Sequence, residues 1–164
     1  MVYNSHEREI MAPPSEVGLL IDSLASKHDR LWPRHEWPAM RLDRALGVGA
    51  TGGHGPIRYV VTDYEPGRKV EFRFIGPSGF NGAHAFIAFE LASGTTLLKH
   101  ELSMSPKWIA RITWPLFFRP MHDALIEECL DLAELECGSP QRTKHRRSLW
   151  TRILRAPFSS GLSR

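Results

Sequence analysis

The chain has 164 residues, of which 42% are hydrophobic and 24% are charged, a composition that suits one globular domain with a core of its own. No window approaches the ~18 uninterrupted apolar residues that a membrane-spanning helix needs, and residues 1–11 contain no apolar signal core. These features argue against a transmembrane or secreted protein, and we expect a soluble, cytoplasmic one.

The net charge of +3 is unevenly distributed along the chain. Residues 1–137 carry an excess of Asp and Glu over Lys and Arg, whereas residues 138–164 carry seven basic residues and no acidic one. We therefore expect a folded domain over residues 1–137 and a basic C-terminal extension over residues 138–164.

The first quarter of the chain predicts one strand and two short helices. Residues 3–11 alternate loosely between apolar and polar side chains, which indicates a strand. An Ala-Pro-Pro sequence ends it, and Ser15 is a candidate N-cap for an amphipathic helix over residues 17–24. A second helical turn is expected over residues 26–31.

The segment that follows is expected to be largely irregular. Trp32-Pro33 and Trp37-Pro38 interrupt any helix, because a residue that precedes proline is pushed out of the helical region. Residues 41–48 predict a strand, and the five glycines within residues 47–55 predict a flexible loop.

Two hairpins follow. Residues 57–64 and 69–75 alternate in polarity around a Pro-Gly turn, and residues 83–91 and 95–104 do the same around Ala-Ser-Gly. The alternation alone does not show which side of its strand His84 and Glu90 occupy.

The longest helical pattern covers residues 106–136. At 100° per residue, His122 shares an apolar side with Leu125, Ile126, Cys129, Leu132 and Ala133, whereas Asp123, Glu127, Asp131 and Glu134 lie on the opposite side. Pro115 and Pro120 predict a kink or a new start near residues 117–119, because proline removes a backbone donor. Cys129 and Cys137, about 12 Å apart along such a helix, are expected to be free thiols.

Three stretches of the chain have a recognisable sequence: EREIMAPPSEVGLLIDSL, YEPGRKVEFRF and HAFIAFELASGTTLLKHELSM. Together they resemble the START-like, polyketide cyclase and dehydrase group, which has the helix-grip fold. The resemblance covers residues 5–136 and departs at Gly18, where many relatives carry a bulky aromatic residue. It implies an α+β fold in which a curved antiparallel sheet of six or seven strands wraps around the long C-terminal helix, with two short helices after the first strand. It also implies an apolar cavity between sheet and helix, which relatives use to hold lipids, sterols or polyketides and, in a minority, for acid–base chemistry.

The side chains expected to face this cavity come from the long helix and the hairpins. They are His100, His122, Phe72, Phe74, Leu98, Leu102, Phe118, Leu125, Ile126 and Cys129. Buried aromatic and aliphatic side chains mostly belong to the core, so packing in the core is the more common role for any single apolar member of this set. The two histidines stand out because a buried imidazole needs a hydrogen-bond partner, which a ligand, a water or the other histidine could supply. We expect His54 to be exposed or at the mouth of the cavity.

The principal functional prediction is the binding of an apolar small molecule or lipid in this cavity, with no cofactor. The alternative is a polyketide cyclase or dehydratase in which His100 or His122 acts as acid or base, with Glu101 or Tyr59 as a partner. We predict no metal site, because the histidines show no ligand spacing of a known kind. Cys129 has acidic neighbours that disfavour a thiolate, and we expect it to be part of the core.

The basic extension mixes apolar and cationic residues over residues 141–158. Such a pattern is typical of a helix that lies on an anionic membrane surface, although a loosely packed extension has the same composition. We expect no nucleic-acid binding, because no folded nucleic-acid-binding motif accompanies the charges.

Overall fold

The computed structural model describes residues 1–138 and 146–159, with side chains described as far as residue 156. Seven antiparallel strands form one sheet in the order β1-β7-β6-β5-β4-β3-β2. Their bounds are β1 Val2–Ile10, β2 Arg41–Leu42, β3 Thr51–His54, β4 Ile57–Glu65, β5 Lys69–Gly76, β6 Gly82–Glu90 and β7 Thr96–Met104. The two predicted hairpins, β4-β5 and β6-β7, are confirmed.

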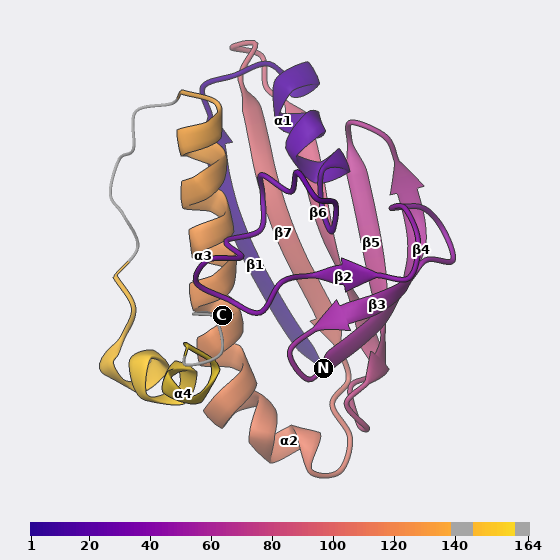
Figure 1. Ribbon diagram of the computed structural model, residues 1–164, viewed down its shortest axis with the longest axis vertical. Helices are drawn as coiled ribbons and strands as arrows, with labels where there is room; N and C mark the ends of the chain where they lie inside the picture. Colours follow the sequence, from indigo (N-terminus) through magenta and orange to yellow (C-terminus); the bar gives the residue numbers. More distant parts are fainter. Residues whose placement is uncertain (139–145, 160–164) are drawn as a thin grey trace.

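The helices lie on one side of this sheet (Figure 1). They are α1 Pro14–Asp22, α2 Ala110–Thr113, α3 Arg119–Glu136 and α4 Leu149–Ser159, and a π-helical segment η1, Trp114–Phe118, joins α2 to α3. The α3 helix runs along β1, and the rest of the sheet curves away from it (Figure 1). The predicted helix-grip architecture is therefore confirmed. No helix in the described ranges is long and apolar enough to cross a membrane.

The interruption predicted near residues 117–119 is the π-helical segment. Pro115 is near its start and Pro120 is near the start of α3. A proline cannot donate the backbone hydrogen bond of a regular helix, so the helix between the two prolines takes the wider π-helical form. The predicted helix start at residue 106 was wrong, since α2 begins at Ala110.

Two details predicted for the start of the chain were also wrong. Residues 26–31 form turns instead of a helix, because the Asp29 carboxylate accepts hydrogen bonds from the backbone N–H groups of Ala25, Leu31 and Trp32. Ser15 is not the N-cap of α1. The helix starts at Pro14 and has no side-chain cap.

Part of the glycine-rich stretch is a strand and not a flexible loop. The predicted strand over residues 41–48 shrinks to β2, and Thr51–His54 forms β3 against it. A Cβ atom on Gly52 would lie 1.9 Å from the Arg41 carbonyl oxygen, and one on Gly53 would lie 1.9 Å from the Ile57 carbonyl oxygen. These glycines allow neighbouring backbones to approach closely at the edge of the sheet.

Gly18 has a comparable role in α1. A Cβ atom there would lie 2.1 Å from the carbonyl oxygen of Gly67, in the β4-β5 turn. Asp22 holds the same turn, since its carboxylate accepts hydrogen bonds from the Gly67 N–H at 2.8 Å and the Tyr64 hydroxyl at 2.9 Å. The glycine that departs from the family pattern therefore lets α1 lie directly on this hairpin.

The acidic side of α3 lies opposite its apolar side, as the helical pattern indicated, and it faces β1. Arg8 donates hydrogen bonds to Glu127 at 2.8 Å, Asp131 at 3.1 Å and Glu134 at 2.7 Å. The Glu134 side chain is only 2% exposed. One guanidinium group thus pairs with three carboxylates between β1 and α3.

Candidate functional site

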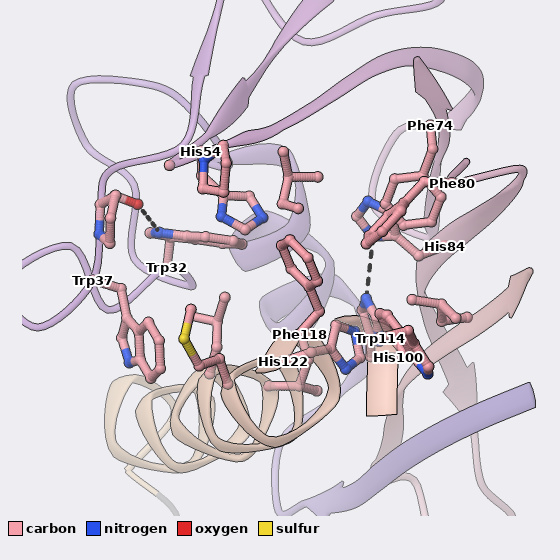
Figure 2. A pocket seen from close by; sticks show the side chains of 18 of the residues that line it. Trp32, Trp37, His54, Phe74, Phe80, His84, His100, Trp114, Phe118 and His122 are labelled. Atoms are coloured by element: carbon pink, nitrogen blue, oxygen red, sulfur yellow. Dashed lines mark hydrogen bonds between the residues drawn. The ribbon is translucent and has the colours of Figure 1, made fainter. Parts of the chain in front are cut away.

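A cavity of about 70 Å³ lies between α3, η1 and the concave side of the sheet (Figure 2). The irregular segment that contains Trp32 and Trp37 and the β3-β4 turn form the opposite wall. Its walls are mostly aromatic and aliphatic, and four histidines are the ionisable residues among them. The lining residues are Trp32, Trp37, Pro38, His54, Gly55, Pro56, Ile57, Phe74, Phe80, His84, Phe86, His100, Leu102, Trp114, Phe118, Met121, His122, Leu125 and Ile126.

The cavity is small for a ligand site. Pockets that enclose drug-sized molecules typically measure about 300–1,000 Å³. The side chains of Phe118 and Met121 are only partly buried, and both belong to the segment that contains the two prolines. A ligand of more than a few heavy atoms therefore requires some of these wall side chains to move.

Most of the predicted site residues lie around this cavity. His100, His122, Phe74, Leu102, Phe118, Leu125 and Ile126 line it. Phe72, Leu98 and Cys129 do not, and each is fully buried in the surrounding core. The contact of these residues with a ligand stays a prediction.

Other lining residues were not predicted. His84 lies on the inner side of β6 together with the buried Phe86 and Ala88, which settles the orientation that the alternation left open. Glu90 shares this parity but is exposed, as the last residue of the strand. Trp32 and Trp37 come from a segment without periodicity, so no pattern indicated their direction. The only sequence feature that could have indicated their role is that each is a large aromatic residue next to a proline.

His84 and His100 form a hydrogen-bonded pair inside the cavity wall. His84 Nδ1 and His100 Nε2 are 3.2 Å apart (Figure 2). Burial lowers the pKa of both imidazoles well below the ordinary value, so both are neutral near pH 7. One ring donates and the other accepts. His100 Nδ1 is buried and has no hydrogen-bond partner among the described residues.

His122 continues the line of imidazoles toward β1. Its ring centroid is 5.1 Å from that of His100 and 6.1 Å from that of His6. Its Nδ1 lies 3.5 Å from a carboxylate oxygen of Asp123, and its buried Nε2 has no hydrogen-bond partner among the described residues. Burial lowers the pKa of His122, although the hydrogen bond to Asp123 opposes this effect. The predicted neighbours His100 and His122 are thus in ring contact but not hydrogen-bonded to each other.

His6 lies outside the cavity and is charged. Its Nδ1 is 2.7 Å from Glu127 and its Nε2 is 3.2 Å from Asp123. Burial disfavours the charged ring, but the hydrogen bonds to the two carboxylates outweigh this effect and raise the pKa of His6 to about 9.

This pKa predicts a pH-dependent contribution to stability. Because the folded-state pKa lies above the ordinary value of 6.5, the contribution of His6 is fully present below about pH 6.5 and is lost as the pH rises through about 9. We expect the stability difference between wild type and His6→Asn to shrink by about 1–2 kcal/mol across this window, an amount that allows for solvent screening. Urea unfolding at a series of pH values measures it, with the exposed His28→Asn as control. A difference that is constant or grows with pH would contradict this assignment.

One cluster in the described part of the chain has the donor set of a metal site. Donor atoms of His6, His122 and Asp123 lie within 4.8 Å of one another. The same Asp123 oxygen already accepts a hydrogen bond from the Asn4 amide at 2.9 Å and contacts His6. The charges in this cluster are therefore paired within the protein, and a bound cation would have to displace the proton that His6 shares with these carboxylates.

The two residues suggested as acid–base partners lie in different places. Tyr59 is fully buried, with its ring centroid 5.4 Å from that of His84, and burial raises the pKa of its hydroxyl above its usual range. Glu101 lies on the outer side of β7 and pairs with Lys99 at 3.1 Å, so it does not reach the cavity. Burial also raises the pKa of the Cys129 thiol, which agrees with its place in the core.

The chain matches no protein-family model and no curated protein sequence. Solved structures do resemble it. The protein XoxI from Bacillus cereus is 17% identical with a TM-score of 0.61, over 85% of this chain and 100% of that one. CalU16 from Micromonospora echinospora is 14% identical with a TM-score of 0.58, over 98% and 86% of the two chains. A norcoclaurine synthase mutant from Thalictrum, in complex with a transition-state analogue, is 15% identical with a TM-score of 0.55, over 79% and 94%.

At this level of identity the likenesses establish the fold. The chain has the helix-grip fold that its sequence resemblance implied. Within that fold, its candidate site is an apolar cavity whose ionisable side chains are imidazoles.

Proposed function

We propose that this protein binds an apolar small molecule, or the apolar part of a lipid, in the cavity between α3 and the sheet. The observation that supports it is the composition of the wall. Aromatic and aliphatic side chains supply most of the contact surface, and His84, His100 and His122 supply a few converging polar groups. This division of roles is typical of small-molecule pockets, where apolar surface provides affinity and polar groups fix orientation.

The neutral state of the buried histidines suits a ligand without charge. A neutral imidazole offers one donor and one acceptor, so it can hydrogen-bond a hydroxyl or a carbonyl group. Burying such a ligand group beside His100 Nδ1 or His122 Nε2 would satisfy a nitrogen that has no partner among the described residues. We therefore expect a neutral ligand that carries at least one hydroxyl or carbonyl oxygen.

Native mass spectrometry tests this proposal on full-length protein purified from the cells that naturally make it, without detergent or organic solvent. We expect a population heavier than the bare chain by the mass of one small molecule, which organic extraction releases from the denatured protein. Spectra that show only the bare chain, in gentle conditions and from fresh preparations, would contradict it.

An acid–base enzyme is the second candidate, favoured by the contact between His122 and Asp123. An imidazole that lines a cavity and is backed by a carboxylate has the arrangement of a general base. Norcoclaurine synthase, a structural neighbour, has been captured with a transition-state analogue. If the protein cyclises a linear polyketone analogue, the rate should fall at low pH as His122 gains a proton. In His122→Gln this pH dependence should vanish, and a profile that the substitution leaves unchanged would exclude His122 as the base.

A further inference from the structure

Half of the large apolar side chains that are exposed in residues 1–138 and 146–156 belong to two neighbouring segments. We call this set the apolar end face; it consists of Trp108, Ile109, Ile112, Leu116, Phe117, Leu149, Trp150 and Ile153. The Trp108 side chain is the most exposed of them, at 74%. A concentration of exposed apolar side chains on one part of a protein marks a surface with a partner.

Direct contacts join the two segments. The Trp150 indole N–H donates a hydrogen bond to the Leu116 carbonyl oxygen at 2.8 Å, and the rings of Trp150 and Phe117 are 6.4 Å apart. Both segments lie at the lower end of the molecule, with α4 beside the start of α3 and α2 just below it (Figure 1). Trp150 and its contacts with Leu116 and Phe117 therefore link the two segments that carry the eight side chains.

The orientation of α4 is fixed by its other side. Arg155 donates hydrogen bonds to the Glu36 side chain at 2.6 Å and to its backbone carbonyl at 2.7 Å, and Arg147 pairs with Glu36 and Glu128. Both guanidinium groups lie over the Trp37 ring, that of Arg155 at 5.4 Å and that of Arg147 at 5.9 Å from its centroid. Because these contacts hold the helix down, Leu149, Trp150 and Ile153 stay exposed on the outside.

The charged residues of the two segments themselves are all basic. Five exposed basic residues belong to the same segments or flank them: Lys107, Arg111, Arg119, Arg146 and Arg152. Residues 105–122 and 138–164 contain no Asp or Glu, although residues 1–137 as a whole are acidic. The combination of exposed tryptophans, aliphatic side chains and a cationic rim matches the interface of an anionic membrane.

We propose that the apolar end face docks on an anionic lipid bilayer. Trp108, Trp150 and the aliphatic side chains would enter the interface, while the basic residues would contact lipid phosphates. A second copy of the chain fits less well, because a two-fold contact through this surface brings the same cations together. Trp108, whose side chain is exposed, also has a φ of 50°, a left-handed conformation that is unfavourable for a bulky residue.

Docking would bring the bilayer next to the cavity. The segment that presents Leu116 and Phe117 outward presents Trp114 and Phe118 to the cavity. A bilayer bound to the end face would therefore lie against the outside of one cavity wall. The docking proposal stands without a cavity ligand, and its test below needs none.

Vesicle co-sedimentation of the full-length chain tests the proposal. The vesicles contain either phosphatidylcholine alone or phosphatidylcholine mixed with phosphatidylglycerol. We expect binding to the mixed vesicles that weakens with salt, and much weaker binding to phosphatidylcholine alone. The variants Ile109→Glu/Ile112→Glu and Lys107→Glu/Arg111→Glu should each bind the mixed vesicles at least about tenfold more weakly.

The matched control is Leu19→Glu/Leu135→Glu, which places the same charges on exposed leucines of α1 and of the far end of α3. It should bind like wild type. Equal binding to both kinds of vesicle, or an equal loss in the control, would overturn the proposal. So would absent vesicle binding together with a dimer in sedimentation velocity that Ile109→Glu/Ile112→Glu dissociates, a result that would assign the surface to a second copy.

Discussion

Replacing Arg8 with methionine is expected to lower the free energy of unfolding by about 3–5 kcal/mol, because it leaves buried carboxylates without their cation. Arg8 donates to Glu127, Asp131 and Glu134, and the last two side chains are 9% and 2% exposed. Methionine keeps most of the apolar stem of arginine but cannot pair with these groups. Urea unfolding at neutral pH gives the difference directly.

The control for this prediction is Arg73→Met, which removes an exposed arginine from β5. Its effect should stay within about 0.5 kcal/mol. Adding Glu134→Gln to Arg8→Met should recover part of the loss, since it removes one unpaired charge. A loss below about 1 kcal/mol for Arg8→Met would mean that the carboxylates find water or other partners.

The Arg8 contacts also show which features of α3 could not be predicted from the sequence. The helical pattern of residues 119–136 separated the apolar side of α3 from the acidic side, and both sides exist. The pattern did not predict what contacts the acidic side, because Asp123 and Glu134 pair with His6 and Arg8, which lie more than a hundred residues earlier in the chain. From sequence alone, an acidic helix face is interpreted as solvent-exposed unless the strand whose basic side chains pair with it is known.

The sheet was predictable wherever side chains alternate in polarity and turns contain Pro-Gly or Ser-Gly, as in β4 to β7. It was not predictable at β3, because Gly52 and Gly53 have low strand propensity and are required only by the close approach of Arg41 and Ile57. The same holds for the cavity wall. Trp32 and Trp37 reach the cavity from an irregular segment, which no periodicity describes.

The histidines were predicted in part. His100 and His122 were predicted to face the cavity because each lies on an apolar face, and both line it. His84 has the same character, but the parity of its strand left two orientations open. Its pairing with His100 depends on the register of β6 against β7, which places His84 opposite Leu102 and two residues from His100 along the ladder.

Filling the cavity is expected to abolish ligand binding. Leu125 lines the cavity and is buried on α3, so the larger indole of Leu125→Trp would occupy much of a space of about 70 Å³. The control Leu135→Trp places the same indole at an exposed position of the same helix. Because an overfilled core costs about 1–3 kcal/mol, circular dichroism and urea unfolding should confirm that the variant is folded. Ile57→Phe, on the opposite wall, provides a second way to fill the cavity.

The central claim is that the cavity between α3 and the sheet holds an apolar molecule. A fluorescence titration with the neutral probe N-phenyl-1-naphthylamine tests this claim most directly. Wild type and Leu135→Trp should bind the probe with the same affinity and a blue-shifted emission. Leu125→Trp and Ile57→Phe, while folded, should bind it at least about tenfold more weakly. A wild-type protein that leaves the probe in water, or filled variants that bind it as wild type does, would contradict a binding cavity at this position.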